Sequence, residues 1–302
     1  MKRHLLGLAV AILTFVAGWS LPPIISKPAG EQVLVLRFDA PLPRTYAWRL
    51  LLSLQNRDLR ELEPLQKTEL RLASASLRGA TEDQFLFARL FTALPTNRGE
   101  QRYLLVEESP LVVFPGESRL RTSLFTSEGY LISSSEFGAG WRIALSHIRL
   151  VQVSGIEGEV LEVESRQMPN GADVAKQFYA LVGDEMRLIR LEDSSGALVQ
   201  NIYSSPNHTI GFTPIGRSAP EWQDDLKSTD VAKVLAALTW LGGEHLSVNE
   251  AEPNYLHEYL SEAQIVEGLR ERSSVKQAVN ALQLSDNPWV RDAATAAAET
   301  IH

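Results

Sequence analysis

The chain has 302 residues and contains no cysteine. This excludes disulfide bonds, thiolate catalysis, cysteine-ligated zinc, iron–sulfur clusters and lipid attachment through a cysteine. Stability must therefore come from packing alone. The composition allows this, because 44% of the residues are hydrophobic and only 22% are charged, as in globular proteins with a large core.

The sequence also lacks the short motifs of common enzymes. It has no G-x-S-x-G nucleophile elbow, no Walker loop and no G-x-G-x-x-G dinucleotide fingerprint. The nearest approach, Gly138-Ala-Gly140, lacks the third glycine and the change from strand to helix that the motif requires. We therefore expect no cofactor, no bound metal and a non-catalytic protein, with an enzyme kept as an alternative below.

No basic stripe is present that would suggest nucleic-acid binding. The net charge of −8 lies entirely in the last third, since residues 219–302 carry 14 acidic and 6 basic side chains. Such a region repels a phosphate backbone. Nucleic acid is thus excluded as an expected partner, and the acidic excess serves solubility.

The N-terminus has the pattern of an export signal. Lys2 and Arg3 precede an apolar run of 15 residues, Leu5 to Trp19. A membrane-spanning helix needs about 20 residues, so this length is typical of a signal peptide. Cleavage is predicted after Gly18, and an uncleaved anchor in the inner membrane formed by residues 5–19 is the alternative. Residues 1–30 are thus predicted to be signal or anchor plus linker, and the protein to be periplasmic or extracellular.

Residues 31–203 are predicted to form a mixed domain. Helical spacing of apolar residues predicts a helix over Arg44–Leu65, ended by Pro64, and a second over Thr81–Leu94, which starts with a capping-box pattern. Residues 69–77 between them are compatible with a strand, and Glu31–Phe38 also has a strand-like pattern.

From Gly99 to Tyr203 the pattern changes to short strands separated by turn residues. Gly183-Asp184 lies between two apolar runs and predicts a hairpin. The strands are expected at 102–107, 111–114, 119–125, 130–133, 141–153, 159–164, 176–182, 186–191 and 198–203. We therefore predict an α+β fold, predominantly an antiparallel meander that forms a curved sheet, a sandwich or a barrel.

Residues 204–220 contain three prolines and two glycines and are predicted to be a linker. Residues 221–302 are predicted to form an all-α domain. Thr229 or Asp230 caps a helix that ends before Gly242, and three further helices are expected over 255–272, 275–284 and 289–301, with Pro288 near the first position of the last.

The last segment, Leu284 to Ile301, has an aspartate, a proline two residues later, then Val-Arg and a run of small residues. This pattern resembles the second helix of a HEAT-type repeat. With an offset of 56, inward positions of the helix after Asp230 align with it: Val234, Ala237, Leu238 and Leu241 opposite Val290, Ala293, Ala294 and Ala297. The resemblance implies stacked helix pairs that hold another macromolecule. The remainder resembles uncharacterised exported bacterial proteins.

Histidines are the first candidates for catalysis. His147 alternates with apolar residues on a predicted strand and is expected to point inward, where it is a weak general-base candidate. His245 and His257 lie with two glutamates in one insertion, but their spacing matches no metalloenzyme motif. Three weak catalytic candidates remain: His147, His245 and His257.

Three functional hypotheses follow. The first is a non-catalytic protein-interaction or scaffold module of the cell envelope that binds an unknown envelope protein, with Trp289, Arg291 and Asp292 on the terminal helix as the candidate partner surface. The second is a carrier that binds an apolar ligand in the β domain. The third is a hydrolase of unknown substrate. The membrane is expected to be contacted only through an uncleaved N-terminal segment.

Overall fold

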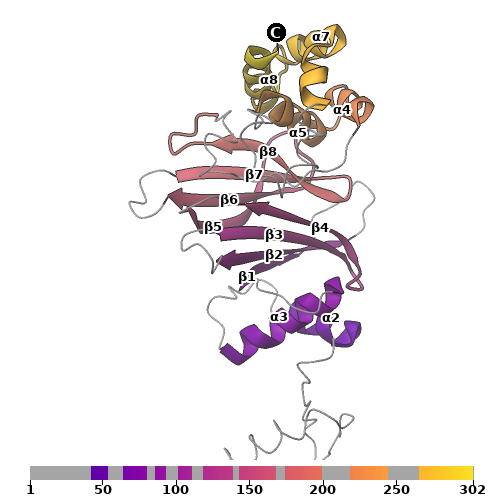
Figure 1. Cartoon of the computed structure of the whole chain (residues 1–302), viewed down its shortest axis with the longest axis vertical. Coiled ribbons are helices and arrows are strands. Elements are labelled where there is room, and N and C mark those ends of the chain that lie inside the picture. The colour runs from indigo at the N-terminus through magenta and orange to yellow at the C-terminus, as the bar shows by residue number, and fades with distance from the viewer. Residues whose placement is uncertain are drawn as a thin grey trace, which may run out of the picture.

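The computed structural model describes residues 42–53, 64–79, 86–92, 101–110, 118–138, 143–167, 174–198, 218–243 and 265–301. These residues form helices and two separate four-stranded antiparallel sheets. The predicted α+β class is confirmed, with two N-terminal helices, an antiparallel meander and C-terminal helices in that order. The sheets do not close into a barrel within the described residues. Figure 1 shows α2 and α3 at one end of the molecule, the C-terminal helices at the other, and the strands between.

Both sheets are meanders in which each strand pairs with the next one along the chain. The first consists of β1 (Leu86–Thr92), β2 (Arg102–Pro110), β3 (Ser118–Thr126) and β4 (Leu131–Gly138). The second consists of β5 (Ile143–Gln152), β6 (Glu159–Gln167), β7 (Val174–Val182) and β8 (Glu185–Glu192). The hairpin predicted at Gly183-Asp184 joins β7 to β8, and Gly183 has the positive φ of 66° that such a tight turn favours. The predicted strand at 111–114 lies outside the described residues, and of 198–203 only Leu198 is described, in an isolated bridge to Glu192.

The N-terminal helices differ from the prediction in position. They are α2 (Arg44–Ser53) and α3 (Pro64–Arg78). Pro64 therefore begins a helix instead of ending one, which is possible because the first turn of a helix needs no backbone N–H donor there. The strand considered at 69–77 is part of α3. The predicted helix over 81–94 is also wrong, because Leu86–Thr92 forms β1.

The helix α2 packs on the first sheet through Trp48. The indole ring lies 5.2 Å from the ring of Tyr103 and 5.6 Å from that of Phe125, and its Nε1 donates to the carbonyl of Ser127 at 2.8 Å. The turn after β3 lies so close to this ring that a Cβ on Gly129 would come within 2.4 Å of it. Trp48 therefore fixes α2 against both the sheet and the β3–β4 turn.

The helix α3 is held to the same sheet by a buried ionic cluster. The carboxylate of Glu107 on β2 has no solvent-exposed surface; it accepts from Ser74 Oγ at 2.6 Å and from Arg121 Nε at 2.8 Å. Arg78 Nε lies 3.9 Å from the same carboxylate. Ser74 and Arg78 are one helical turn apart on α3, and Arg121 lies on β3. Glu107 on β2 therefore connects α3 to both β2 and β3.

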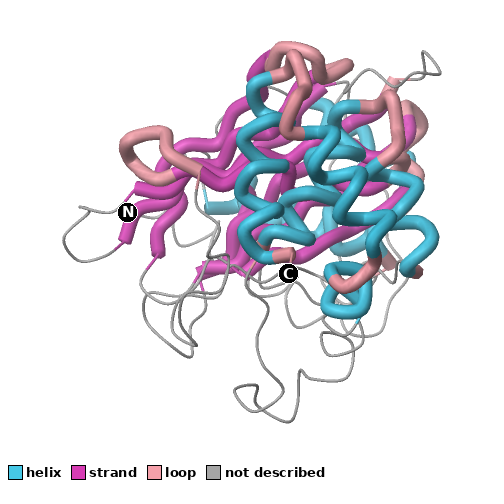
Figure 2. The backbone as a smooth tube through the Cα atoms, turned by 90° about the horizontal axis from the view of Figure 1, so that it is seen from above, coloured by secondary structure: helices cyan, strands magenta, loops and turns pink. Residues whose placement is uncertain are grey.

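The C-terminal helices pack on the outer face of the second sheet. They are α4 (Ala219–Leu226), α5 (Val231–Gly242), α7 (Ser273–Leu282) and α8 (Pro288–Thr300), and residues 265–270 are also helical. The apolar side chains of these helices form one continuous core with Val160 on β6, Phe178 and Ala180 on β7 and Ile189 on β8. Figure 2, seen from above, shows these helices lying over the strands.

The opposite faces of the sheets are buried as well. Leu104 and Val106 on β2 and Leu161 and Val163 on β6 have no exposed surface, although they belong to neither helix-facing cluster. Successive side chains of a strand point to opposite faces, and strands of the two sheets lie in contact, β4 with β8 and β5 with β1 and β3. These side chains therefore fill the space between the sheets. In the described part of the chain, no helix is both long enough and apolar enough to span a membrane.

Candidate functional site

The sequence-predicted partner residues lie on α8, and this helix begins as the sequence indicates. Pro288 occupies its first turn, and the Asn287 side chain accepts hydrogen bonds from the backbone N–H groups of Trp289 at 3.0 Å and Val290 at 3.3 Å. Asn287 is thus the cap, one residue after Asp286, the aspartate of the HEAT-like pattern. Its Nδ2 also donates to the carbonyl of Ser154 in the β5–β6 turn at 3.1 Å. One side chain therefore starts the helix and ties it to the second sheet.

Small residues bring α8 close to α5. All eight aligned inward positions are buried: Val234, Ala237, Leu238, Leu241, Val290, Ala293, Ala294 and Ala297. The closest approach is at the end of α5, where a Cβ on Gly242 would lie 3.2 Å from the Cα of Ala297. At this point a side chain on Gly242, or one larger than alanine at position 297, would force the helices apart.

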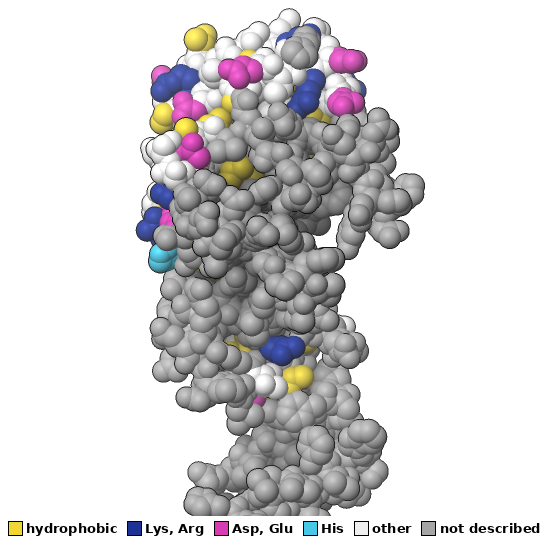
Figure 3. Space-filling view, turned by 60° about the vertical axis from the view of Figure 1, so that its left-hand side comes forward, with side chains coloured by type: hydrophobic (Ala, Val, Ile, Leu, Met, Phe, Trp, Pro, Cys, Tyr) yellow, Lys and Arg dark blue, Asp and Glu magenta, His cyan; other side chains and the backbone are white. Residues whose placement is uncertain are grey.

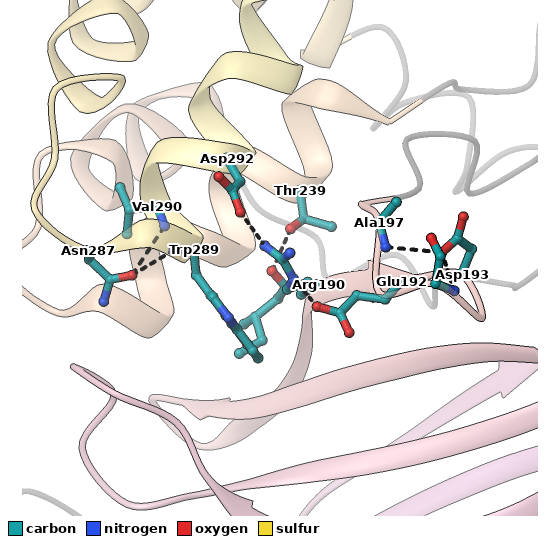
Figure 4. Close-up of polar contacts among 11 residues, drawn as sticks. Arg190, Glu192, Asp193, Ala197, Thr239, Asn287, Trp289, Val290 and Asp292 are labelled. Atoms are coloured by element: carbon teal, nitrogen blue, oxygen red, sulfur yellow. Dashed lines mark hydrogen bonds and ion pairs between the residues drawn. The ribbon is translucent and has the colours of Figure 1, made fainter.

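Arg190 on β8 connects α8 to the sheet, as Figure 4 shows. The Arg190 side chain is only 7% exposed; its Nε donates to Glu192 Oε1 and its Nη1 to Asp292 Oδ2 at 3.4 Å. Its guanidinium lies 5.0 Å from the ring of Trp289, which in turn meets the ring of Phe178 edge-on at 5.0 Å. We call Arg190, Glu192, Trp289 and Asp292 the α8 latch. Sequence reasoning missed Arg190, because its partners on α8, Trp289 and Asp292, are about 100 residues away.

The three predicted partner residues thus have different surroundings. Trp289 is half-buried against Phe178, and Asp292 is bound to Arg190 while about half of its side chain stays exposed. Arg291 is exposed, and its Nη1 donates to the Ser285 carbonyl at 3.1 Å. Trp289 and Asp292 therefore contribute to packing within the chain, and Arg291 is the member of the set that faces solvent.

The C-terminal end of α5 is also fixed by Arg270. Its guanidinium donates to the backbone carbonyls of Leu241, at 2.9 Å from Nε, and of Gly243. The last carbonyls of a helix lack partners within the helix, and a cation there also meets the negative end of the helix dipole. Burial lowers the pKa of Arg270 from its ordinary value, and the coulombic effect of Glu267 opposes this.

His147 does not point inward as predicted; it is exposed. The reason is a β-bulge between Leu145 and His147, which shifts the pairing register by one residue. Ile148 takes the inward position, and it is buried. In the register of the second sheet, His147 stands opposite Glu164, Glu164 opposite Lys176, and Lys176 opposite Glu192.

An ion pair lies beside this row. Arg149 Nη2 donates to both carboxylate oxygens of Glu162, at 2.8 and 3.0 Å. Glu162 is only 6% exposed, while the Arg149 side chain is 59% exposed. The alternating charges of this row stand opposite one another across the four strands, in the positions that cross-strand pairs occupy. This face therefore offers a fixed polar surface.

The other histidine candidates, His245 and His257, lie outside the described residues. Among the residues that are described, no group of three or more histidine, aspartate or glutamate side chains is arranged to hold a metal ion. Acidic and basic side chains are interspersed at the end of the molecule formed by the C-terminal helices (Figure 3). The geometry of this end is that of a rigid polar surface on a packed apolar core. A comparison of the chain with models of protein families, with curated proteins and with solved structures finds no match.

Proposed function

We propose that the chain is an exported, non-catalytic scaffold protein whose C-terminal helices present a rigid surface to another protein of the cell envelope. The observation that carries this proposal is the way α8 is fixed. The α8 latch and the small-residue seam with α5 hold the helix on two sides, so the side chains on its free side keep defined positions. A surface ordered before binding loses little conformational entropy on association.

The packing of the four helices supports the resemblance to HEAT repeats. The hairpin α4–α5 lies beside the hairpin α7–α8, with α4 in contact with α7 and α5 in contact with α8. Helix pairs in solenoid proteins stack in this way. On α7, Gln277 and Asn280 are exposed, and a polar outer face of this kind is typical of the terminal pair of a stack.

The solvent-exposed side of α8 defines the proposed contact. Arg291, Thr295 and Glu299 are all exposed, and their spacing of four residues places them along one face of the helix. We call them the α8 stripe. It carries one positive and one negative charge separated by two helical turns, so a partner with the opposite order of charges would fit it.

Photo-cross-linking in cells tests this function. A photoreactive amino acid at Thr295 should give an adduct with one defined envelope protein, whereas the same group at the exposed Gln101 should not. The charge exchange Arg291→Glu/Glu299→Lys should reduce the adduct, and the exposed Glu271→Lys is the matched control. Equal adducts at both positions, or none at Thr295, would contradict the proposal. Point variants are needed because removal of the helices would uncover Phe178 and Ile189.

The two alternatives have less support. A carrier needs space between the sheets, and the described inner side chains Leu104, Val106, Leu161 and Val163 are completely buried. A hydrolase built on His147 would have to use a side chain on an exposed sheet face, opposite Glu164. Export itself still rests on the sequence pattern of residues 1–19.

A further inference from the structure

The first turn of α2 and the β3–β4 turn form one corner of the molecule. The guanidinium of Arg44 lies over the ring of Tyr130, 3.5 Å from its centroid, and its Nη1 lies 3.5 Å from the carbonyl of Glu128. Trp48 on α2 also joins the two segments, because it donates a hydrogen bond to the Ser127 carbonyl and lies in close contact with Gly129. The corner is therefore one rigid unit made from two distant parts of the sequence.

This corner exposes apolar and cationic side chains together. Tyr130 is 53% and Leu131 36% exposed; they are two of the three large hydrophobic residues exposed in the described part of the chain. Arg44 and Arg49 on α2 are exposed, and α2 has no acidic residue. We call Arg44, Arg49, Tyr130 and Leu131 the α2 corner. One acid lies beside it: hydrogen bonds from Ser127 and Thr126 lower the pKa of Glu128, so its charge opposes one of the two arginines.

The position of the α2 corner in the chain indicates what covers it. It belongs to the end of the molecule at which the described chain begins, opposite the C-terminal helices (Figure 1). In the sequence, 24 residues lie between Trp19, the end of the apolar run that starts at Leu5, and Arg44. We propose that the α2 corner is a contact surface for an anionic lipid bilayer, formed when the N-terminal segment stays in the membrane. The proposal rests on the predicted export and on retention of that segment.

The chemistry of the corner fits the interfacial region of a bilayer. Tyrosine and arginine side chains are favoured at the headgroup level, because each combines an apolar part with a polar end. Each arginine near an anionic surface strengthens binding about fivefold, so Arg44 and Arg49 together contribute about thirtyfold. A contact of this strength is too weak to hold the protein at a membrane alone. The N-terminal segment, if retained in the bilayer, would act as a tether that raises the local concentration of the α2 corner at the lipid surface.

The absence of cysteine makes a direct test possible. A single cysteine at the exposed Thr45 carries a fluorescent label, and the full-length chain is reconstituted into phosphatidylcholine vesicles with or without phosphatidylglycerol. Quenching by nitroxide-labelled lipid should be strong at Thr45 and should require phosphatidylglycerol. A label at the exposed Gln277 on α7, at the other end of the molecule, is the matched position and should stay unquenched.

Two charge reversals complete the test. Arg44→Glu/Arg49→Glu should lower the ratio of membrane-contacting to free molecules at least about thirtyfold. Arg49→Glu alone leaves the Arg44–Tyr130 contact in place and should give at least about a fivefold loss, so a folding defect is not needed to explain it. Quenching that is equal at Thr45 and Gln277, independent of anionic lipid, or unchanged in both variants would overturn the proposal. Because the readout is lipid quenching, it is independent of the cross-link that tests the α8 stripe.

Discussion

The buried cluster around Glu107 allows the attachment of α3 to be measured. Replacing Glu107 by glutamine keeps the shape of the side chain and removes its charge. Arg121 and Arg78, whose side chains are only 6% and 9% exposed, then lose the carboxylate that compensates them. Breaking a buried pair on one side costs about 3–5 kcal/mol, because the remaining charge stays desolvated. We therefore expect Glu107→Gln to lower the free energy of unfolding by about 3–5 kcal/mol.

The pair itself contributes much less than this loss. Two unit charges about 4 Å apart attract by about 4 kcal/mol at an effective dielectric constant of 20, and desolvation of both groups offsets most of that gain. The double variant Glu107→Gln/Arg121→Met should accordingly be less destabilised than the sum of the two single variants, with a coupling energy of about 2 kcal/mol or more.

The wild type, the two single variants and the double variant form a double-mutant cycle. Urea unfolding, followed by tryptophan fluorescence and circular dichroism, measures the free energy of unfolding of each of these four proteins. Unchanged m-values are required, because they show that the variants unfold from the same native state. The control is Asp184→Asn, which breaks the ion pair with Arg102 (3.7 Å, Asp184 64% exposed) and should cost less than about 1 kcal/mol. Single variants at Glu107 and Arg121 that each cost no more than this control, with additive effects, would refute the reasoning.

Three further predictions concern local structure. Gly129→Ala should lower the free energy of unfolding by about 2–4 kcal/mol, because the new Cβ would meet the ring of Trp48 at 2.4 Å. The control Gly79→Ala has a similar positive φ but open space around it, and should cost about 1 kcal/mol. Equal losses of stability in thermal unfolding would contradict the steric argument. Burial raises the pKa of Tyr179 well above its ordinary value of 10, so the folded state keeps a proton that the unfolded state releases. The contribution of the Tyr179 hydroxyl to stability is thus fully present below pH 10, and above pH 10 the free energy of unfolding should fall by about 1.4 kcal/mol per pH unit. The Tyr179→Phe variant should lack this slope. The same slope in the variant and the wild type, measured by urea titrations at pH 9–11, would contradict the prediction. Arg270→Met should lower stability by about 1.5–3 kcal/mol by leaving the Leu241 and Gly243 carbonyls without this donor, and amide exchange should accelerate in the last turn of α5 before it does in α2.

Helices with distinct ends were predicted correctly from local sequence. Asp230 caps α5 through a hydrogen bond to the Ala232 N–H, and Pro288 lies in the first turn of α8, both as expected. The hairpin turn at Gly183 was also predicted, because a glycine at positive φ between two apolar runs has few other solutions. These features depend on residues within a few positions of each other, so the sequence is sufficient.

The N-terminal region shows where local patterns fail. Phe87, Leu90 and Phe91 have helical spacing, yet they lie in β1, because pairing with β2 provides the backbone hydrogen bonds of this segment. A proline such as Pro64 can end one helix or begin the next, and the spacing of apolar residues alone does not decide between them. Similarly, the bulge before His147 reverses which side chains of β5 point inward, and bulges have no strong sequence signal.

By itself, the sequence determined the class of the fold, the hairpin turn at Gly183, the Asp230 cap of α5 and the excess of acid in the last third. Only the tertiary structure decided which side chains are free. It placed Trp289 and Asp292 against Phe178 and Arg190, left Arg291 in solvent, and joined Arg44 to Tyr130 in one exposed corner. The physical reason is that these contacts join residues about 85 to 110 positions apart, and such contacts depend on strand register and helix docking that no local pattern specifies.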